Sequence, residues 1–355
     1  MDKRILNFSK LLVLSIIALS FFACGDNEST KLPPIDNGKD GLYILCEGVF
    51  QHNNSALDFY PTDSSIEKDI FQTVNSMGLG ETANDMIKVG NELWIAVSGS
   101  ATVMILNLSD GALLKMIPIV NERGVNRQPR HLIQYGNYVY LTCFDGNVIK
   151  ISVKNKEISG ILNTKGRNPE GIATAKGKIY VTNSGGLDFP NYDTSVSVID
   201  PTTFSVEKLI KVKDNPQVIK AYNNKVYVVS TGDYSDSYRL TVIEDGEKKD
   251  SVDMNITDFA FYNGFLYYIY KPWGSGKATL NKLDVNNIHS APVEFAKVPE
   301  KLVTPYRICI INDTIYVCDN KNATVSGEVF VFNNNDGFLY SFETSIGPNT
   351  IIKKK

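Results

Sequence analysis

The chain has 355 residues, of which 43% are hydrophobic, 10% aromatic and 21% charged. This composition is ordinary for a globular protein, and it excludes a disordered, collagen-like or multi-span membrane chain. A formal net charge of -3 provides no basic excess to attract phosphate backbones, so nucleic acid is not an expected partner.

The first 23 residues are predicted to be a lipoprotein signal peptide. Basic residues precede an apolar run from Leu11 to Phe22, which is too short to cross a membrane comfortably as a helix. The segment Leu19–Cys24, with the letters LSFFAC, resembles the lipobox of bacterial lipoproteins. The resemblance implies cleavage before Cys24 and lipidation of that cysteine. An ordinary cleaved signal followed by an incidental cysteine is the alternative.

Residues 24–40 are predicted to be a polar tether, because acidic residues there are followed by Pro33-Pro34 and Asn37-Gly38. Acidic residues directly behind a lipidated cysteine are similar to the surface-export signal of some Gram-negative lipoproteins. We therefore expect a lipid anchor on Cys24 that holds the chain in the outer membrane, with the protein exposed at the cell surface. A plain acidic linker is the alternative interpretation of these residues.

A repeated pattern fills residues 41–355. Each copy has an apolar strand, a Gly/Asn turn and a second strand centred on an aromatic residue, followed by a third alternating strand and a weaker fourth. The central aromatics are 46, 40, 47, 40 and 49 residues apart. They are Trp94, Tyr140, Tyr180, Tyr227, Tyr267 and Tyr316. A period in the forties with four short strands per unit is typical of a propeller blade.

The two ends of this region complement each other. Gly41–Leu45 matches the aromatic second strand, Ala56–Tyr60 the third and Ile66–Phe71 the fourth, while Gly347–Ile352 supplies the missing first strand. Joining the ends removes the exposed sheet edges that a linear array would leave. The predicted fold is therefore all-β, a seven-bladed β-propeller over residues 41–355 with a composite closing blade. Unrelated hairpins stacked in sandwiches are the alternative.

Four cysteines follow Cys24, and none of them forms a CxxC pair, which argues against a zinc ribbon or a redox site. Cys309 and Cys318 flank a predicted hairpin turn, but both lie in apolar runs, so buried free thiols are expected.

Two segments resemble the YVTN, or YncE-like, propeller repeat. They are Asn168–Ala173 with Lys178–Asn183, and Asn215–Val218 with Val226–Ser230. The resemblance covers essentially the whole propeller region and specifies the fold rather than the function.

A narrower resemblance concerns Gly41–Gly48, Asn53–Leu57 and Gly80–Met86. These segments are similar to lipoprotein propellers encoded beside TonB-dependent transporters, of which the BtuG type is the best known. The resemblance implies capture of cobalamin or a related corrinoid at the cell surface and its transfer to a TonB-dependent outer-membrane transporter. Siderophores and glycans remain open as ligands, and a protein-interaction scaffold remains open as a function.

Catalytic motifs do not stand out in the sequence. His131 begins an apolar strand and is interpreted as a structural residue, while His289 lies in a polar connection. The sequence contains no HExxH motif, no P-loop and no Ca²⁺-binding DxDxDG loop. We therefore expect no enzymatic activity, no cofactor and no metal; a propeller hydrolase or lyase is the rival class.

The ligand-binding face of a propeller is built by the loop that leads into each blade and by the loop between its second and third strands. Aromatic side chains in such loops are costly unless they pack on something, and guanidinium groups bind carboxylate, phosphate or amide oxygens. Loop-pinning contacts and surface ion pairs are the alternative roles for these side chains. The candidate ligand-binding residues are His52, Asn53, Asn84, Arg127, Arg130, Asn168, Asn183, Phe189, Tyr192, Asp233, Tyr234, Tyr238, Trp273 and Arg307.

Overall fold

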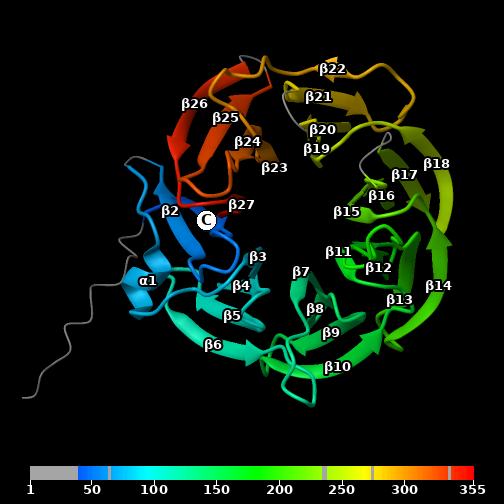
Figure 1. Cartoon of the computed structure of the whole chain (residues 1–355), viewed down its shortest axis with the longest axis horizontal. Coiled ribbons are helices and arrows are strands. Elements are labelled where there is room, and N and C mark those ends of the chain that lie inside the picture. Colours follow the sequence, from blue (N-terminus) through cyan, green and yellow to red (C-terminus); the bar gives the residue numbers. More distant parts are fainter. Residues whose placement is uncertain (1–38, 63–64, 234–237, 273–275, 335–336) are drawn as a thin grey trace, which may run out of the picture. The chain divides into compact units, whose positions relative to one another are not determined.

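Seven antiparallel sheets form a closed ring (Figure 1) in the computed structural model, which describes residues 39–62, 65–233, 238–272, 276–334 and 337–355. Six sheets have four strands in sequence order, and the seventh has three strands in the order β2-β1-β27. The chain is therefore a seven-bladed β-propeller, as the repeat predicts. The predicted signal peptide and nearly all of the predicted tether lie outside the described residues, as do Cys24, Tyr234 and Trp273.

The strands have the following bounds. The composite blade contains β27 (Pro348–Lys353), β1 (Gly41–Cys46) and β2 (Ala56–Pro61). The next three blades are β3 (Ala83–Val89), β4 (Glu92–Val97), β5 (Thr102–Asn107) and β6 (Leu113–Pro118); β7 (Pro129–Tyr135), β8 (Tyr138–Cys143), β9 (Asn147–Ser152) and β10 (Glu157–Asn163); and β11 (Pro169–Ala175), β12 (Lys178–Asn183), β13 (Ser195–Asp200) and β14 (Ser205–Lys211). The last three are β15 (Pro216–Tyr222), β16 (Lys225–Ser230), β17 (Arg239–Glu244) and β18 (Glu247–Asp253); β19 (Asp258–Tyr262), β20 (Phe265–Tyr270), β21 (Thr279–Asp284) and β22 (Val293–Glu294); and β23 (Pro305–Ile311), β24 (Thr314–Asp319), β25 (Glu328–Asn333) and β26 (Gly337–Glu343).

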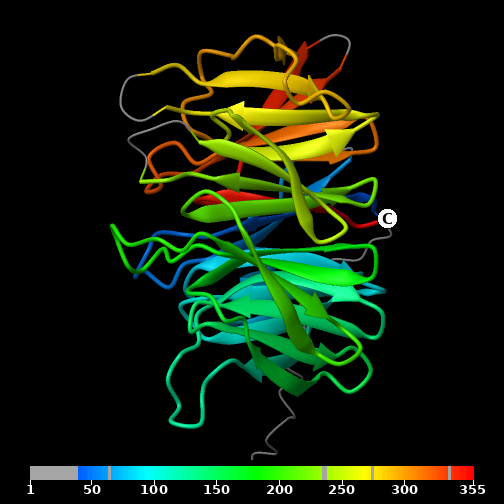
Figure 2. The ribbon, with the colours of Figure 1, turned by 90° about the vertical axis from the view of Figure 1, so that its right-hand side faces the viewer.

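The first strand of every blade lies innermost, around the ring axis (Figure 1). Because neighbouring strands are antiparallel, the loops leading into the inner strands and the loops between second and third strands gather on one face, here called the loop face. Figure 2 shows the ring from the side, with these longer loops on the left and tight hairpins on the right. The fold thus assembles one face from the loops that sequence analysis assigned to binding.

Hydrophobic packing between neighbouring blades holds the ring together. The central aromatics Trp94, Tyr140, Tyr180, Tyr227 and Tyr267 are buried. Trp94, for example, packs in one cluster with apolar side chains of β8 and β9 in the next blade. These large side chains remove apolar area from water on both sides of each blade, which makes each blade depend on its neighbours.

The prediction that the two chain ends close the ring in one composite blade is confirmed, whereas the predicted fourth strand of that blade is wrong. β1 pairs with β2 on one side and with β27 on the other, so the two ends of the propeller share one sheet. The segment Ile66–Phe71, predicted as the fourth strand, instead forms one isolated bridge through Glu67 and then enters helix α1 (Ile70–Asn75). The Asp69 side chain accepts a hydrogen bond from the Gln72 amide at the helix start.

Helix α1 replaces the strand because two consecutive apolar residues, Ile70 and Phe71, are both buried in the same cluster. A strand would send these neighbours to opposite faces of its sheet, whereas a helical turn lets both reach the core. In the described part of the chain, no helix is long and apolar enough to cross a membrane.

The cysteines of the described residues are free thiols, as expected: Cys46, Cys143 and Cys318 are buried and Cys309 is partly buried. In the β23–β24 register Cys318 lies opposite Arg307, and Cys309 lies opposite Tyr316. The two cysteines are therefore not cross-strand partners. Burial raises the pKa of the Cys309 thiol to about 12, which keeps it protonated and unreactive.

Asp58 ties the composite blade to the end of the preceding blade. Its fully buried carboxylate accepts hydrogen bonds from the backbone amides of Asp69, at 2.9 Å, and Ser345, at 2.7 Å, and from the Ser345 hydroxyl at 2.7 Å. The buried charge thus has several donors, which compensate for the loss of its hydration.

We predict that Asp58→Ala lowers the free energy of unfolding by about 2–4 kcal/mol, because three partly buried donors lose their acceptor. Urea unfolding followed by circular dichroism measures this loss. Glu122→Ala removes an exposed carboxylate and serves as the control, with an expected change within about 0.5 kcal/mol. A loss below about 1 kcal/mol for Asp58→Ala would contradict a role in closing the ring.

Candidate functional site

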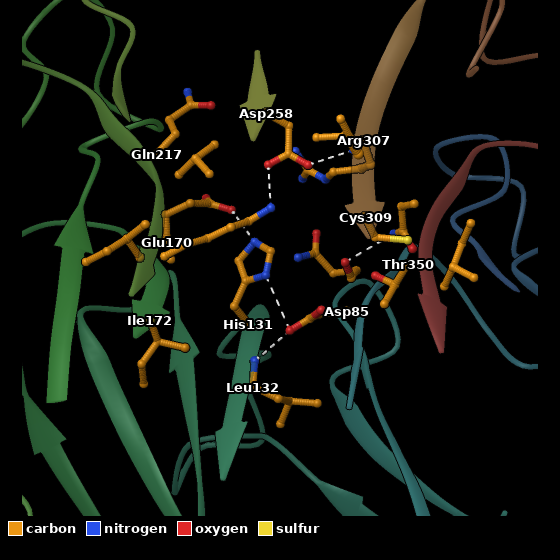
Figure 3. A pocket seen from close by; sticks show the side chains of 18 residues that line it. Asp85, His131, Leu132, Glu170, Ile172, Gln217, Asp258, Arg307, Cys309 and Thr350 are labelled. Carbon is orange, nitrogen blue, oxygen red and sulfur yellow. Dashed lines mark hydrogen bonds and ion pairs between the residues drawn. The ribbon is translucent and has the colours of Figure 1, made fainter. Parts of the chain in front are cut away.

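An axial cavity of about 290 Å³ lies where the seven inner strands meet. Each of β3, β7, β11, β15, β19, β23 and β27 contributes residues to its wall. Figure 3 shows that polar and charged side chains from opposite sides of the ring point into this space, His131 and Glu170 from one side and Arg307 and Asp258 from others. The axial cavity therefore contains charged and polar side chains beside apolar ones such as Leu132, Ile172 and Ile219.

Arg130 and Glu170 form the strongest ion pair of this region. Arg130 Nε lies 3.1 and 3.2 Å from the two carboxylate oxygens, and Nη2 lies 2.8 Å from Oε1. The guanidinium carbon also lies 4.4 Å from the ring centroid of Phe144. Burial alone would raise the pKa of Glu170, but Arg130 and His131 lower it to about 2. Glu170 is thus a carboxylate at any physiological pH.

His131 lies between two carboxylates of neighbouring blades. Its Nδ1 is 3.4 Å from Asp85 Oδ2, and its Nε2 is 3.4 Å from Glu170 Oε1 (Figure 3). Burial alone would lower the pKa of His131, but hydrogen bonds to Asp85 and Glu170 and their charges raise it to about 9. At neutral pH His131 is a cation that joins two carboxylates, which suits a structural bridge better than a general base.

The remaining charged groups near the axis are also connected. Lys220 Nζ lies 2.9 Å from Asp258 Oδ1, and the other oxygen of Asp258 accepts the Ile308 amide at 3.0 Å. Glu47 Oε1 accepts hydrogen bonds from the Tyr306 hydroxyl at 3.0 Å and from Asn349 Nδ2 at 2.9 Å. Polar contacts therefore link the inner strands of separate blades, in addition to the hydrophobic packing between neighbouring blades.

A second and larger cavity, here called the upper hollow, opens at the loop face above the axial cavity, with a volume of about 610 Å³. The two cavities share four lining residues, so they form one continuous site region. The shared residues are Glu170, Gln217, Val218 and Arg307. Ligand sites in proteins typically have volumes between about 300 and 1,000 Å³, which places the upper hollow in that range.

Four of the predicted ligand-binding residues line this site region. Arg130 and Tyr238 line the upper hollow, Asn84 lines the axial cavity, and Arg307 lines both. Asn84 donates its side-chain amide to the Arg130 carbonyl at 2.9 Å, and the Tyr238 ring packs edge-to-face on Tyr270 with centroids 6.0 Å apart.

Other predicted residues lie on the loop face but outside both cavity walls. Arg127 forms an ion pair with Asp145, and Asp233 is exposed. Phe189 is 70% exposed and packs edge-to-face on Tyr192, with ring centroids 5.9 Å apart.

Asn53, Asn168 and His52 form hydrogen bonds that hold the loops. Asn168 Nδ2 donates to the Phe144 carbonyl at 2.8 Å, and the Asn53 backbone N–H donates to Glu81 Oε2 at 2.6 Å. The His52 ring lies 2.9 Å from the Phe50 carbonyl.

Asn183 lies inside its blade rather than on the loop face. It is fully buried, and its side-chain amide donates to the hydroxyls of Ser195 and Ser197. This position corrects its expected location, because the last residue of the second strand points into the sheet packing rather than into the loop.

Sequence reasoning predicted Arg130 and Arg307 but missed other residues that line the site region, and all of these share a position in the repeat. Most inner strands open with a proline, and the residues just after it reach the axial cavity, the upper hollow or both. They are Arg130 and His131 after Pro129, Glu170 after Pro169, Gln217 after Pro216, Tyr306 and Arg307 after Pro305, and Asn349 after Pro348. Alignment of the repeats on the proline would have found those that were missed: His131, Glu170, Gln217, Tyr306 and Asn349.

In the described residues, no group of three or more His, Cys, Asp and Glu side chains has an arrangement that could hold a metal ion.

We predict that His131 stabilises the fold in a pH-dependent way. Its pKa is raised from 6.5 to about 9, so its contribution is complete below about pH 6.5 and is lost as the pH rises towards 9. The free energy of unfolding should therefore differ between wild type and His131→Gln by about 2–3 kcal/mol near pH 6, and the difference should shrink as the pH approaches 9.

Chemical unfolding of both proteins across this pH range measures the difference. His289→Gln is the control, because that histidine pairs with Asp250 at the surface and should change stability by less than about 0.5 kcal/mol. A wild-type advantage that stays constant with pH would show that His131 is not the bridging cation.

Several solved structures share this fold, at sequence identities that are informative about the fold alone. A quinonprotein alcohol dehydrogenase-like protein from Bacteroides thetaiotaomicron has a TM-score of 0.62 at 13% identity, covering 89% of this chain and 78% of that one. Hydrazine synthase from Kuenenia stuttgartiensis has a TM-score of 0.59 at 13% identity, covering 73% and 85%. Apo AztD from Citrobacter koseri has a TM-score of 0.51 at 11% identity, covering 89% and 98%.

Sequence comparison gives a family without a described activity. No curated protein matches the chain. The family model described as a domain of unknown function, DUF5074, matches residues 40–262, which is more than half of the chain and extends from the composite blade to the end of β19. The chain therefore belongs to the DUF5074 family.

Proposed function

We propose that this protein is a surface-exposed outer-membrane lipoprotein that captures a small nutrient molecule in the upper hollow and passes it to a TonB-dependent transporter. Cobalamin or a related corrinoid is the first ligand we propose. The observation that carries the proposal is the upper hollow itself, a cavity of about 610 Å³ on the loop face that continues into the polar axial cavity.

The wall of the upper hollow has the mixed chemistry of a ligand site. Tyr238, Tyr306 and Pro272 provide ring surfaces, Thr231, Thr257 and Thr304 provide hydroxyls, and Arg130, Lys271 and Arg307 provide positive charge. Aromatic and ring surfaces bind the flat parts of a ligand, while a few fixed polar groups select its orientation.

Cobalamin is favoured among the possible ligands by the resemblance of the first blade to BtuG-type propellers. A corrinoid presents many side-chain amides and one phosphate, and the hydroxyls and arginines of the hollow suit these groups. The same inventory suits siderophores and glycans, which are the alternative ligands. Because the blades are held by packing and by axial ion pairs, the hollow is preformed, and binding costs little ordering.

The rim of the loop face offers apolar contacts for a partner such as the transporter. Phe50, Leu187 and Phe189 are 73%, 63% and 70% exposed, and they belong to the loops β1–β2 and β12–β13. Exposed apolar side chains around a binding site commonly mark a protein interface. The rim also favours a protein-interaction scaffold as the second candidate function.

We propose binding without catalysis, because the carboxylates of the axial cavity already have cationic partners. Arg130 is paired with Glu170, and Lys220 with Asp258. A general acid or base needs a pKa near the working pH, whereas the pKa of Glu170 is held at about 2.

Isothermal titration of the purified protein with cyanocobalamin tests the proposal, with one-to-one binding as the expected result. Val303→Trp and Val325→Trp form a matched pair of variants, because both valines are about half exposed on loops of the same face, and only Val303 lines the upper hollow. We expect Val303→Trp to weaken binding by at least about ten-fold through steric filling of the hollow, and Val325→Trp to leave it unchanged.

The possible outcomes distinguish an error in the proposed ligand from an error in the proposed binding site. Binding that both variants retain would move the ligand away from the upper hollow. The absence of a heat signal with cyanocobalamin would exclude a corrinoid as the ligand. Siderophores and glycans would then be tested with the same pair of variants. If every panel failed, the protein-interaction scaffold would replace nutrient capture.

A further inference from the structure

Arg307 differs from the other charged side chains of the axial cavity in having no ionic partner among the described residues. In the part of the chain that the structure describes, Asp85 and Glu170 both contact His131, and Lys220 pairs with Asp258. For the Arg307 guanidinium, the described residues supply neither an ion pair nor a hydrogen-bond acceptor.

The orientation of Arg307 is nevertheless fixed. Its guanidinium carbon lies 4.5 Å from the ring centroid of Tyr306, and the Tyr306 hydroxyl donates to Glu47 at 3.0 Å. A guanidinium placed over an aromatic ring can still donate hydrogen bonds, because the ring contact does not use up its N–H donors. Arg307 is thus held against the Tyr306 ring, while its N–H donor edge carries no described acceptor.

Arg307 also lies where the two cavities meet, since it belongs to the wall of the axial cavity and to that of the upper hollow. Figure 3 shows it projecting from β23 into the same space as Asp258. A molecule that enters the upper hollow from the loop face therefore meets this guanidinium at the base of the hollow, directly above the polar axis.

The nearby carboxylates do not serve as partners of Arg307, although three of them act on it electrostatically: Asp258, Glu47 and Glu170. Asp258 is neutralised by Lys220 and Glu170 by Arg130, while Glu47 accepts hydrogen bonds from Tyr306 and Asn349. Each of these groups is already committed to other donors.

An unpaired guanidinium in a partly enclosed site is costly, because its five N–H donors lose part of their hydration without gaining acceptors. The planar fork of donors matches the two oxygens of a carboxylate or a phosphate. A bound oxyanion would remove the cost and complete the pairing of charges around the axis.

We propose that Arg307 is the anchor for an oxyanion group, a carboxylate or a phosphate, of the molecule that binds in the upper hollow. This inference rests on the proposed capture function and specifies the chemistry of its ligand. In a corrinoid the matching group is the phosphate diester, whereas in a siderophore or an acidic glycan it is a carboxylate.

The experiment begins with inorganic anions, so that it does not depend on the identity of the natural ligand. Thermal unfolding of the full chain is measured during titration with sodium phosphate and with sodium acetate, at ionic strength balanced with sodium chloride. The Nε–Hε signal of Arg307, assigned by its loss in Arg307→Gln, is followed by NMR in the same titrations. We expect a saturable shift of this signal and of the unfolding midpoint, and the stronger of the two anions identifies the preferred group.

Three variants locate the effect. Arg307→Gln should weaken anion binding by at least about ten-fold, because the charge-assisted hydrogen bonds are lost. Arg123→Gln is the matched control, since it removes an equal charge from an exposed loop of the same face and should retain wild-type binding. Arg307→Lys keeps the charge without the planar fork, and intermediate binding is expected from it even if Arg307→Gln does not fold.

Equal anion binding by wild type and Arg307→Lys, or no saturable response of wild type, would overturn the oxyanion site. A corrinoid pair then separates this result from the capture function: cobalamin carries the phosphate diester, and cobinamide lacks it. If Arg307 anchors the phosphate, Arg307→Lys weakens cobalamin binding and leaves cobinamide binding unchanged. If the wild-type protein binds anions at Arg307 but binds neither cobalamin nor cobinamide, the corrinoid is excluded as the ligand and the oxyanion site is retained.

Discussion

The pairing of β1 with β27 is the constraint on which the rest of the structure depends. Each blade buries its apolar side chains against two neighbours, so an open ring would expose the faces of two sheets as well as their edges. Closure also fixes the direction of every inner strand, because all seven must begin at the same face. The loop face, the upper hollow and the axial cavity all follow from this common direction.

Closure concentrates polar side chains at the axis, where buried charges are tolerated only when they are paired. Side chains of one blade accordingly bond to the backbone of the next: Asp85 accepts the Leu132 amide at 2.9 Å, and the Thr142 hydroxyl donates to the Glu170 carbonyl at 2.6 Å. Such contacts fix the position of each inner strand along the ring axis relative to the neighbouring inner strand. These hydrogen bonds between a side chain of one blade and the backbone of the next therefore help to set the register between blades.

This arrangement separates the parts that hold the fold from the parts that recognise a ligand. The large aromatic residues between blades and the paired charges of the axis make the scaffold rigid, while the loop face varies in length and chemistry. Recognition on a rigid scaffold loses little entropy on binding, so a few well-placed groups suffice. Arg307 belongs to both parts, since its ring contact with Tyr306 is structural and its donor edge faces the cavities.

The sequence by itself determined the propeller, because a period in the forties and two complementary chain ends are visible along the chain. It also placed Arg130, Tyr238 and Arg307 near the site, since loop positions follow from the repeat. It misplaced the segment Ile66–Phe71, where helix capping and the burial of two consecutive apolar residues override a weak strand pattern. Only the tertiary structure decided which side chains meet at the axis, because residues about forty positions apart become neighbours solely through closure of the ring.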